Sequence, residues 1–364
     1  MRDRPSAEGL AGVLISPTDD RWARALVHTR HDVYDTPSYA LIEADHAQAD
    51  PIGFLVEDDD YIFLVPLLIR RVPLMGHIDD DVAWDAISPY GYPGIVLSES
   101  ARSSQSFVSG CTKAMVGLLA ERGICSAFIR LHPHLNADLP MLITSPGVTP
   151  NGLTVSIDLQ QSVERIWATM RKGHTNAVNQ AVRAGFTTSI VRHPEHFDDV
   201  TSVYGETLSR HSASASAYDY DESLLRRLAM LDEAHIAVAE IDGVVAGAYI
   251  LFECNGIVQM HLGGSLSAYR RPSPSNLLIH AVALWAKQRG NAYLHLGGGI
   301  GGSSEDNLFM FKSGFSPVRH EFATLRLVAD QVRYDKLVAA RSDEVGVSSA
   351  TLLASDFFPA YRAG

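Results

Sequence analysis

The sequence has little cysteine, no long apolar run and no excess of positive charge. Its three cysteines, Cys111, Cys125 and Cys254, lie far apart and form neither a disulfide framework nor a zinc-site spacing, so a reducing cytoplasm is the expected location. The longest apolar stretch, residues 61–69, is about half of the ~20 residues that a membrane helix needs. The net charge of −12 argues against a surface that is basic all over, although a local basic cleft remains possible.

Several catalytic and metal-binding patterns are also missing. The chain contains no G-x-S-x-G elbow and no G-x-x-x-x-G-K-[ST] loop, which removes support for a hydrolase triad or an ATPase. The histidine pairs 132/134 and 193/196 lack a helical i, i+4 spacing and a cysteine partner, so we predict no metal site. We likewise expect no bound cofactor.

What is present is the composition of a folded protein of two domains. The 364 residues are 46% hydrophobic and 20% charged, which is typical of a globular chain and is too long for one compact core. Two stretches repeat one order of strands, helix and strand, and both helices end in a basic residue followed by glycine. This repetition predicts an internally duplicated fold of the α/β or α+β class. The expected elements are strands at 52–57, 61–70 and 124–132 with a helix at 107–122, and strands at 234–241, 244–253, 256–262 and 292–296 with a helix at 276–289.

The segment between the two stretches reads as two short helices with a break. Apolar residues at i, i+3, i+4 and i+7 predict a helix over 163–170, and a second helix is expected over 176–184. Arg171, Lys172 and His174 form a basic cluster at the break, which we call the basic knot. Such a cluster holds a phosphate or is simply a solvated helix end. Residues 211–220 have no periodicity and predict a loop that closes over a ligand or serves as a linker.

A glycine run and a lysine among aromatic residues are the most conspicuous local motifs. Residues 297–302 read GGGIGG, but they come late in the domain, so a dinucleotide site is rejected. The run instead predicts a turn whose backbone approaches a ligand closely. Lys312 follows Phe311 shortly after this turn, where it is either an ordinary surface lysine or a fixed cation for developing negative charge.

Taken together, these motifs resemble the FemXAB-type branch of the GNAT acyltransferase superfamily over roughly residues 30–320. The segments that carry the resemblance are SPYGYPGI (88–95), FIRLHP (128–133), RKGHTNAVNQAVRAG (171–185), Y-x-E-T-x-x-R (204–210), LGGG (296–299) and LFMFKSGF (308–315). The resemblance implies an α+β fold of two tandem GNAT-like domains. We place domain one at 1–150 together with 321–364, and domain two, with the catalytic site, at 151–320.

The resemblance also implies a reaction and a set of residues. Members of this branch transfer an aminoacyl group from aminoacyl-tRNA to an amine of a peptide, nucleotide-linked or antibiotic-type acceptor. The expected partners are therefore charged tRNA and an amine-bearing acceptor. The predicted catalytic residues are Lys312, His261 and Asp306, with Glu206 as a further candidate base. The predicted substrate-binding residues are Phe311, Arg171, Lys172, His174, Tyr90, Tyr92, Arg130, His132, Glu206, Arg210, Tyr218, Gly297, Gly298 and Gly299.

One departure bears on the donor. GNAT enzymes that use coenzyme A carry [RQ]-x-x-G-x-[GA] before their central helix, whereas residues 270–276 here read RRPSPSN. Pro272 and Pro274 have no N–H to offer a pyrophosphate. This favours a tRNA donor over the alternative, an acyl-CoA-dependent N-acyltransferase acting on a sugar or small-molecule amine. A binding protein without catalytic activity is a third possibility.

Overall fold

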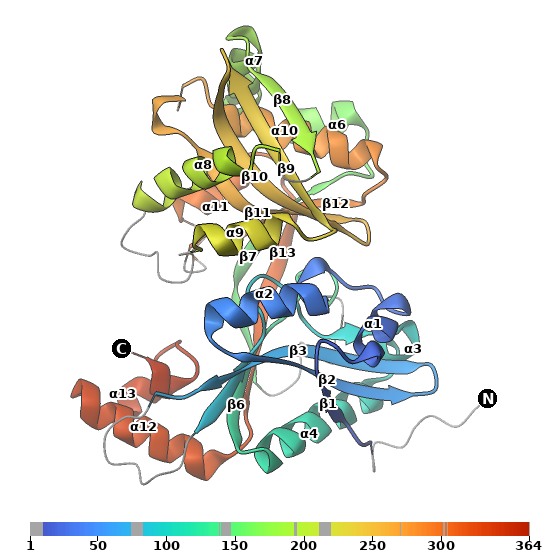
Figure 1. Cartoon of the computed structure of the whole chain (residues 1–364), viewed down its shortest axis with the longest axis vertical. Coiled ribbons are helices and arrows are strands. Elements are labelled where there is room, and N and C mark those ends of the chain that lie inside the picture. Colours follow the sequence, from blue (N-terminus) through green and yellow to red (C-terminus); the bar gives the residue numbers. More distant parts are fainter. Residues whose placement is uncertain are drawn as a thin grey trace. The chain divides into compact units, whose positions relative to one another are not determined.

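The computed structural model describes residues 10–73, 83–137, 139, 147–192, 195–210, 220–269, 271–300, 303 and 305–363. It divides into two compact units. Unit 1 comprises residues 1–151 and 322–364, and unit 2 comprises residues 152–321. Both units are mixed β-sheets flanked by helices (Figure 1), so the predicted α+β class is confirmed.

The sheet of unit 1 has the strand order β1-β2-β3-β4-β6-β13, and β5 also pairs with β3. Neighbouring strands are antiparallel except for β4 and β6, which are parallel. Figure 1 shows α2 and α4 on opposite faces of this sheet. The elements are β1 (Val13–Ile15), α1 (Asp20–Val27), α2 (Pro37–Ala47), β2 (Asp50–Asp58), β3 (Tyr61–Arg71), β4 (Trp84–Ile87), β5 (Val96–Leu97), α3 (Glu99–Arg102), α4 (Gln105–Glu121), β6 (Ile124–Arg130), β13 (Arg319–Val328), α12 (Gln331–Val345) and α13 (Ser349–Leu353).

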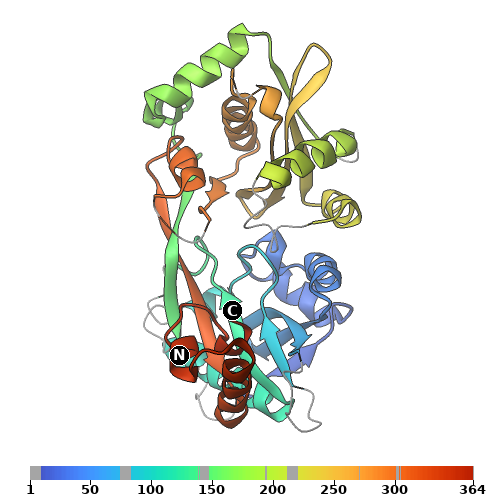
Figure 2. The same ribbon diagram turned by 90° about the vertical axis from the view of Figure 1, so that its left-hand side faces the viewer.

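The sheet of unit 2 has the order β7-β12-β11-β10-β9-β8, with β11 and β12 as its parallel pair. Figure 2 shows α10 and α8 on opposite faces of this sheet. The elements are β7 (Val148–Asp158), α6 (Val163–Thr169), α7 (Lys172–Arg183), β8 (Thr187–Val191), α8 (Phe197–Arg210), α9 (Glu222–Ala229), β9 (Ala234–Ile241), β10 (Val244–Cys254), β11 (Ile257–Ser265), α10 (Pro274–Gln288), β12 (Tyr293–Gly297) and α11 (Asn307–Lys312).

The predicted internal duplication is confirmed by strand order. In unit 1 the run β2-β3-β4 is followed by helix α4 and by β6, which is parallel to β4. In unit 2 the run β9-β10-β11 is followed by α10 and by β12, which is parallel to β11. Each parallel pair is thus joined by one crossover helix, as parallel strands require.

The central helix of unit 2 shows how sequence determines position. Leu278, Val282 and Ala286 are fully buried or nearly so and repeat at four-residue intervals, which places them on one helix face. They belong to the core that this helix forms against the sheet. The helix begins at Pro274, because proline at the first helical position loses no hydrogen bond. The predicted start at residue 276 was therefore two residues late.

The second helix of the basic knot also begins earlier than predicted. It spans Lys172–Arg183 rather than 176–184, and the chain breaks at Met170 and Arg171 instead. Gly173 lies in the first turn, where the backbone N–H groups have no intrahelical partner in any case. The break is held from outside the helix, since the Arg171 N–H donates to the Gly314 carbonyl at 2.8 Å.

Candidate functional site

The parallel strands β11 and β12 of unit 2 pair only over their first three residues. The register runs Ile257↔Tyr293, Val258↔Leu294 and Gln259↔His295. Strand β11 then continues to Ser265, whereas Gly297 of β12 pairs with β7. The two strands therefore part after the third pair, and we call this place the fork.

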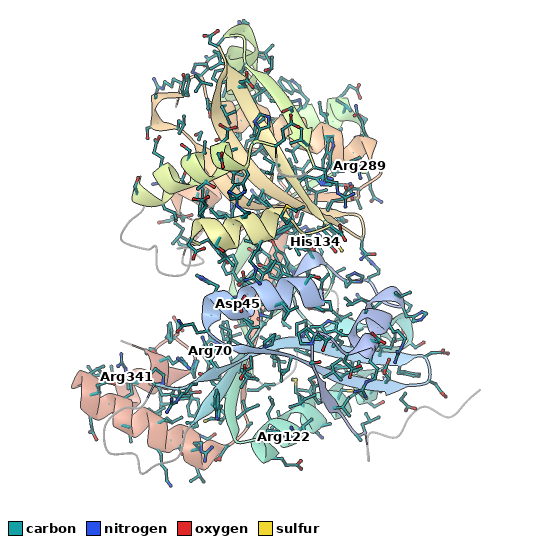
Figure 3. All side chains as sticks on the ribbon, viewed as in Figure 1. Asp45, Arg70, Arg122, His134, Arg289 and Arg341 are labelled. Carbon is teal, nitrogen blue, oxygen red and sulfur yellow. The ribbon has the colours of Figure 1, made fainter. Side chains whose placement is uncertain are left out.

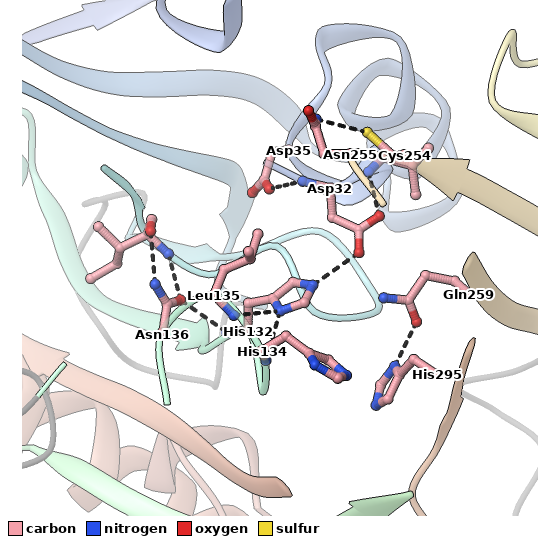
Figure 4. A network of polar contacts seen from close by, with 12 residues as sticks. Asp32, Asp35, His132, His134, Leu135, Asn136, Cys254, Asn255, Gln259 and His295 are labelled. Carbon is pink, nitrogen blue, oxygen red and sulfur yellow. Dashed lines mark hydrogen bonds and ion pairs between the residues drawn. The ribbon is translucent and has the colours of Figure 1, made fainter. Parts of the chain in front are cut away.

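A buried polar pair marks the start of the fork. Gln259 and His295 are 1% and 0% exposed, and Gln259 Oε1 lies 2.6 Å from His295 Nδ1 (Figure 4). Since an amide oxygen only accepts, His295 Nδ1 carries the proton and donates. Sequence analysis did not find this pair, because the two residues are 36 positions apart and only the strand register brings them together.

His261 lies immediately beyond this pair. The register of β10 and β11 shifts from Ile250↔Leu262 to Leu251↔Met260, so His261 is the extra residue of a β-bulge. Bulges re-aim a side chain and end regular pairing. Burial lowers the pKa of His261 to about 3, so its imidazole is neutral at neutral pH.

Lys312 lies at the other arm of the fork. It is the last residue of α11, and its Nζ donates to the Gly298 carbonyl at 2.6 Å. Gly298 directly follows the end of β12. Desolvation lowers the pKa of Lys312 to about 8, opposed by the negative charge of Asp306. The ammonium is therefore fixed at the strand end, as required of a cation that is to meet developing charge.

The glycine turn packs against its own domain. A Cβ on Gly299 would lie 2.3 Å from Asp306 Oδ2 and 2.8 Å from the Phe309 Cβ. The close approach predicted for a ligand is therefore made here by an internal carboxylate. Gly301 and Gly302 lie outside the described residues.

Asp306 has a structural task at this turn. Its Oδ2 accepts from the Phe309 N–H at 2.9 Å, which caps α11, and from the Ile300 N–H at 3.1 Å. The carboxylate thus joins the glycine turn to the helix that carries Lys312. Nothing in this geometry brings out a proton-transfer role, and the catalytic role predicted for Asp306 stays a prediction.

The basic knot is attached to the same helix. Arg171 donates through Nη1 to the Met310 carbonyl at 3.2 Å, and His174 Nε2 donates to the Phe311 carbonyl at 2.8 Å. Burial lowers the pKa of His174, which agrees with a neutral ring inside this contact. Lys172 and Arg171 are exposed. The structure therefore brings Arg171, His174, Phe311 and Lys312 together on one framework.

A fourth cation, which sequence analysis missed, belongs to this group. Arg319 lies over the Phe309 ring, with 5.6 Å from its guanidinium carbon to the ring centroid. Its pKa is lowered by desolvation and by the neighbouring charge of Arg171. Two arginines that repel each other in this way favour an anion between them. The signal in the sequence was only a single arginine four residues after the FKSGF segment.

Three further predicted residues come from α8 and the segment after it. Glu206 accepts from the Ser267 N–H through Oε1 at 2.6 Å, which ties α8 to the end of β11. The backbone of Arg210 ends α8, but its side chain lies outside the description. Tyr218 lies outside the described residues altogether, so its predicted role stays a prediction.

The unit 1 residues form a separate cluster. Arg130 lies over the Tyr90 and Phe128 rings and donates to the Ser88 carbonyl at 3.1 Å. Tyr92 packs edge-on against Phe322, with ring centroids 5.1 Å apart. Arg130, Tyr90 and Tyr92 are partly exposed.

His132 does not line an open surface, which corrects the prediction for it. Its side chain is 0% exposed. Nδ1 accepts from the N–H groups of His134 and Leu135 at 3.0 and 3.1 Å, so Nε2 carries the proton and donates to Asp32 at 2.9 Å (Figure 4). Both ring nitrogens are thus used inside unit 1. Asn136 braces the same turn by accepting from the His132 N–H at 2.9 Å.

Two general properties complete the description. Within the described ranges, no three His, Cys, Asp or Glu side chains are placed to hold a metal ion together. Among the described helices, none combines the length and apolarity needed to cross a bilayer.

Comparison with known proteins agrees with this geometry. Residues 168–305 match the family described as "Acetyltransferase (GNAT) domain". The sequence matches none of the curated proteins. Among solved structures, the chain is similar to FemX, with a TM-score of 0.67, 12% identity, and coverage of 89% of this chain and 99% of FemX.

Two solved synthetase structures are also similar. One is the C-terminal domain (DUF2156) of a putative lysylphosphatidylglycerol synthetase from Agrobacterium fabrum, with a TM-score of 0.55, 16% identity, and coverage of 93% of this chain and 98% of the other. The second, L-PGS from Bacillus licheniformis, gives a TM-score of 0.56, 14% identity, and coverage of 87% and 94%. At these identities the likeness establishes the fold. Unit 2 therefore carries a GNAT acyltransferase domain, and the chain as a whole has the FemX-like fold that its motifs predicted.

Proposed function

We propose that unit 2 transfers an aminoacyl group from aminoacyl-tRNA to the amine of a peptide, nucleotide-linked or antibiotic-type acceptor. The fork with the ammonium of Lys312 at its edge is the observation that carries the proposal. The similarity to FemX and to structures named as lysylphosphatidylglycerol synthetases supports an aminoacyl group as the transferred unit.

In the proposed reaction, the free amine attacks the ester carbonyl that joins the amino acid to the terminal ribose of the tRNA. A C–N bond forms and a tetrahedral oxyanion develops, which the Lys312 ammonium stabilises. Collapse breaks the C–O bond, and the ribose hydroxyl leaves with a proton. The amine loses one proton in the same sequence, so the products are an amide and a free tRNA end.

His261 is the candidate that lies nearest to the fork in the strand register. Its neutral ring accepts a hydrogen bond from the attacking amine, although a pKa of about 3 makes it a weak base. Its contribution is therefore orientation of the amine, and water takes up the proton. Glu206 and Asp306 each accept backbone N–H groups, which lowers their value as bases.

The start of α10 supports tRNA over coenzyme A as the donor. Backbone N–H groups before the central helix are what a pyrophosphate needs, and Pro272 and Pro274 supply none. The next two residues, Ser275 and Asn276, are only 8% and 5% exposed, so their N–H groups are not presented to a large ligand. Loss of two charge-assisted hydrogen bonds corresponds to about 3–6 kcal/mol.

The test measures the mass of the product formed from candidate amines with either charged tRNA or an acyl-CoA. We expect an aminoacylated product with charged tRNA only, and loss of that product after ribonuclease treatment. We also expect tRNA binding to weaken as salt rises, since its contacts are with backbone phosphates. Ribonuclease-resistant turnover with an acyl-CoA would overturn the proposal and favour an acyl-CoA-dependent N-acyltransferase.

A further inference from the structure

Unit 2 contains a second hollow, at the end of α10 opposite to the fork. It has a volume of about 290 Å³, and its lining includes Arg192, Asp232, Glu253, Trp285 and Arg289. Arg289 follows directly after α10 (Figure 3). Because α10 has 15 residues and each adds about 1.5 Å, the hollow lies roughly 20 Å from the end of the helix that adjoins the fork. It is therefore separate from the proposed transfer site.

The carboxylate in this hollow is already saturated. Glu253 accepts from Arg289 Nε at 2.9 Å through both oxygens, from Arg289 Nη2 at 2.8 Å, from Asn291 Nδ2 at 2.7 Å, and lies 3.4 Å from His235 Nε2. A carboxylate offers about four acceptor sites. Glu253 therefore fixes Arg289 in place and has no capacity left for a ligand.

The donors, by contrast, are not used up. Among the residues that the structure describes, Arg289 makes no hydrogen bond through Nη1, and Arg192 makes one only through Nη2, to the Asp232 carbonyl. The Trp285 indole N–H likewise has no acceptor within the described residues, although Arg289 lies 5.2 Å from its ring centroid. The hollow thus offers several donors that Glu253 does not occupy.

Asp232 does not cancel this excess of donors. Its side chain is 97% exposed and lies 3.8 Å from Arg192, which makes it a solvated pair of small energetic value. Arginine guanidinium groups bind carboxylate and phosphate through paired N–H groups. We propose that this hollow binds a small oxyanion, a carboxylate or a phosphate, between Arg192 and Arg289.

The size of the hollow indicates what accompanies the oxyanion. A water molecule takes about 30 Å³ in the liquid, so 290 Å³ admits roughly ten heavy atoms. Trp285 and Ile190 supply an apolar wall for the body of such a molecule. The ligand class is therefore a small organic acid or phosphate ester.

The test titrates the full-length protein with sodium phosphate and, separately, with sodium benzoate at constant ionic strength, by calorimetry and tryptophan fluorescence. We expect saturable binding of at least one of the two, and the stronger binder identifies the head group. Arg192→Gln should weaken binding at least tenfold, since it removes a guanidinium without disturbing the Glu253 clamp. Arg183→Gln, at an exposed arginine of α7, is the matched control and should bind as the wild type does.

Two results would overturn the proposal. One is the absence of saturable binding of both compounds at millimolar concentration. The other is equal binding by wild type and Arg192→Gln. A sharpening variant is Asp232→Asn, which removes a nearby negative charge and should strengthen binding about two- to threefold, whereas weaker binding in that variant would also contradict an oxyanion site. Because the assay measures binding rather than transfer, its outcome is independent of the proposed function.

Discussion

The two units repeat one strand order but differ where their parallel strands part. In unit 2 the pairing of β11 and β12 ends at Gln259 and His295, and the fork follows. In unit 1 the pairing of β4 and β6 is continued by the chain itself. The Ser88 N–H donates to the Phe128 carbonyl at 2.8 Å, and the Arg130 N–H donates to Ser88 Oγ at 3.0 Å.

The loop after β4 closes the unit 1 counterpart still further. The Gly94 N–H donates to the Arg130 carbonyl at 2.9 Å, and the Asn136 side chain exchanges two hydrogen bonds with the backbone of Ile95. The duplicated backbone therefore supplies the same opening twice, and in unit 1 its own residues fill it. The comparison teaches that the strand order alone does not make a site, and that unit 2 is the unit left open for one.

The largest effect is expected for Lys312, since it is the fixed cation at the open fork. Lys312→Ala should lower kcat/KM by about 10²–10³, the loss typical of one contact to a developing oxyanion. Lys336→Ala, at an exposed lysine of α12, should leave kcat/KM within twofold of wild type. Steady-state transfer assays make this measurement, and a Lys312→Ala enzyme with most of its activity would remove Lys312 from the mechanism.

The pH dependence sharpens the same assignment. Burial lowers the pKa of Lys312 to about 8, so its stabilising charge is present below pH 8 and is lost as pH rises through that value. We expect kcat/KM to fall above about pH 8. Lys312→Arg should shift that fall to higher pH, because guanidinium stays protonated. Identical profiles for wild type and Lys312→Arg would contradict the assignment, once hydrolysis of the donor alone has been subtracted.

A change that breaks the closure of unit 1 should affect stability rather than chemistry. Asn136→Ala leaves the buried N–H groups of Ile95 and His132 without their acceptor. Each such group costs about 1–3 kcal/mol, so we expect a loss of about 3 kcal/mol in urea unfolding. Asn179→Ala at an exposed helix position is the control for the same chemical change. An unchanged unfolding midpoint for Asn136→Ala would mean that the closure does not hold unit 1 together.

The contact between α7 and α11 gives a second test of stability, within unit 2. A Cβ on Gly314 would lie 2.1 Å from the His174 ring, whereas one on Gly173 meets nothing within 4 Å. Gly314→Ala should therefore destabilise unit 2 by about 1–3 kcal/mol, and Gly173→Ala should be neutral or slightly stabilising. Equal unfolding midpoints for the two variants would contradict the described packing of the basic knot on α11.

The basic knot should give the smallest effect. If Arg171 and Lys172 hold a phosphate of the acceptor, replacing both with alanine should raise KM for a phosphate-bearing acceptor about tenfold. The value of kcat should change less, because ground-state contacts contribute uniform binding. Initial rates over a range of acceptor concentrations measure both. A KM that does not move would show that the knot does not bind the acceptor.

These contrasts also show what the sequence could and could not predict. Helix α10 was predictable because its apolar residues repeat at helical spacing, and only its start was misplaced. Helix α2 was missed although Thr36 and Pro37 give a cap and a first-turn proline, which are readable start signals. The lysine at the fork was found because it follows an aromatic residue and a glycine turn in sequence.

The fork itself was beyond sequence reasoning. It depends on the register of two strands and on a bulge at His261, and neither leaves a local pattern. The same holds for the burial of His132, because Asp32 lies 100 residues away. Arg319 was overlooked because only the folded chain brings it near Arg171.

The most direct test of the account is a crystal structure of the full chain with a stable amide analogue of an aminoacylated tRNA end, such as 3′-aminoacylamino-3′-deoxyadenosine. The account predicts that the aminoacyl group lies between β11 and β12 beyond the Gln259–His295 pair, with its carbonyl oxygen close to Lys312 Nζ. Density for the analogue against β4 and β6 of unit 1, with none in the fork of unit 2, would contradict it.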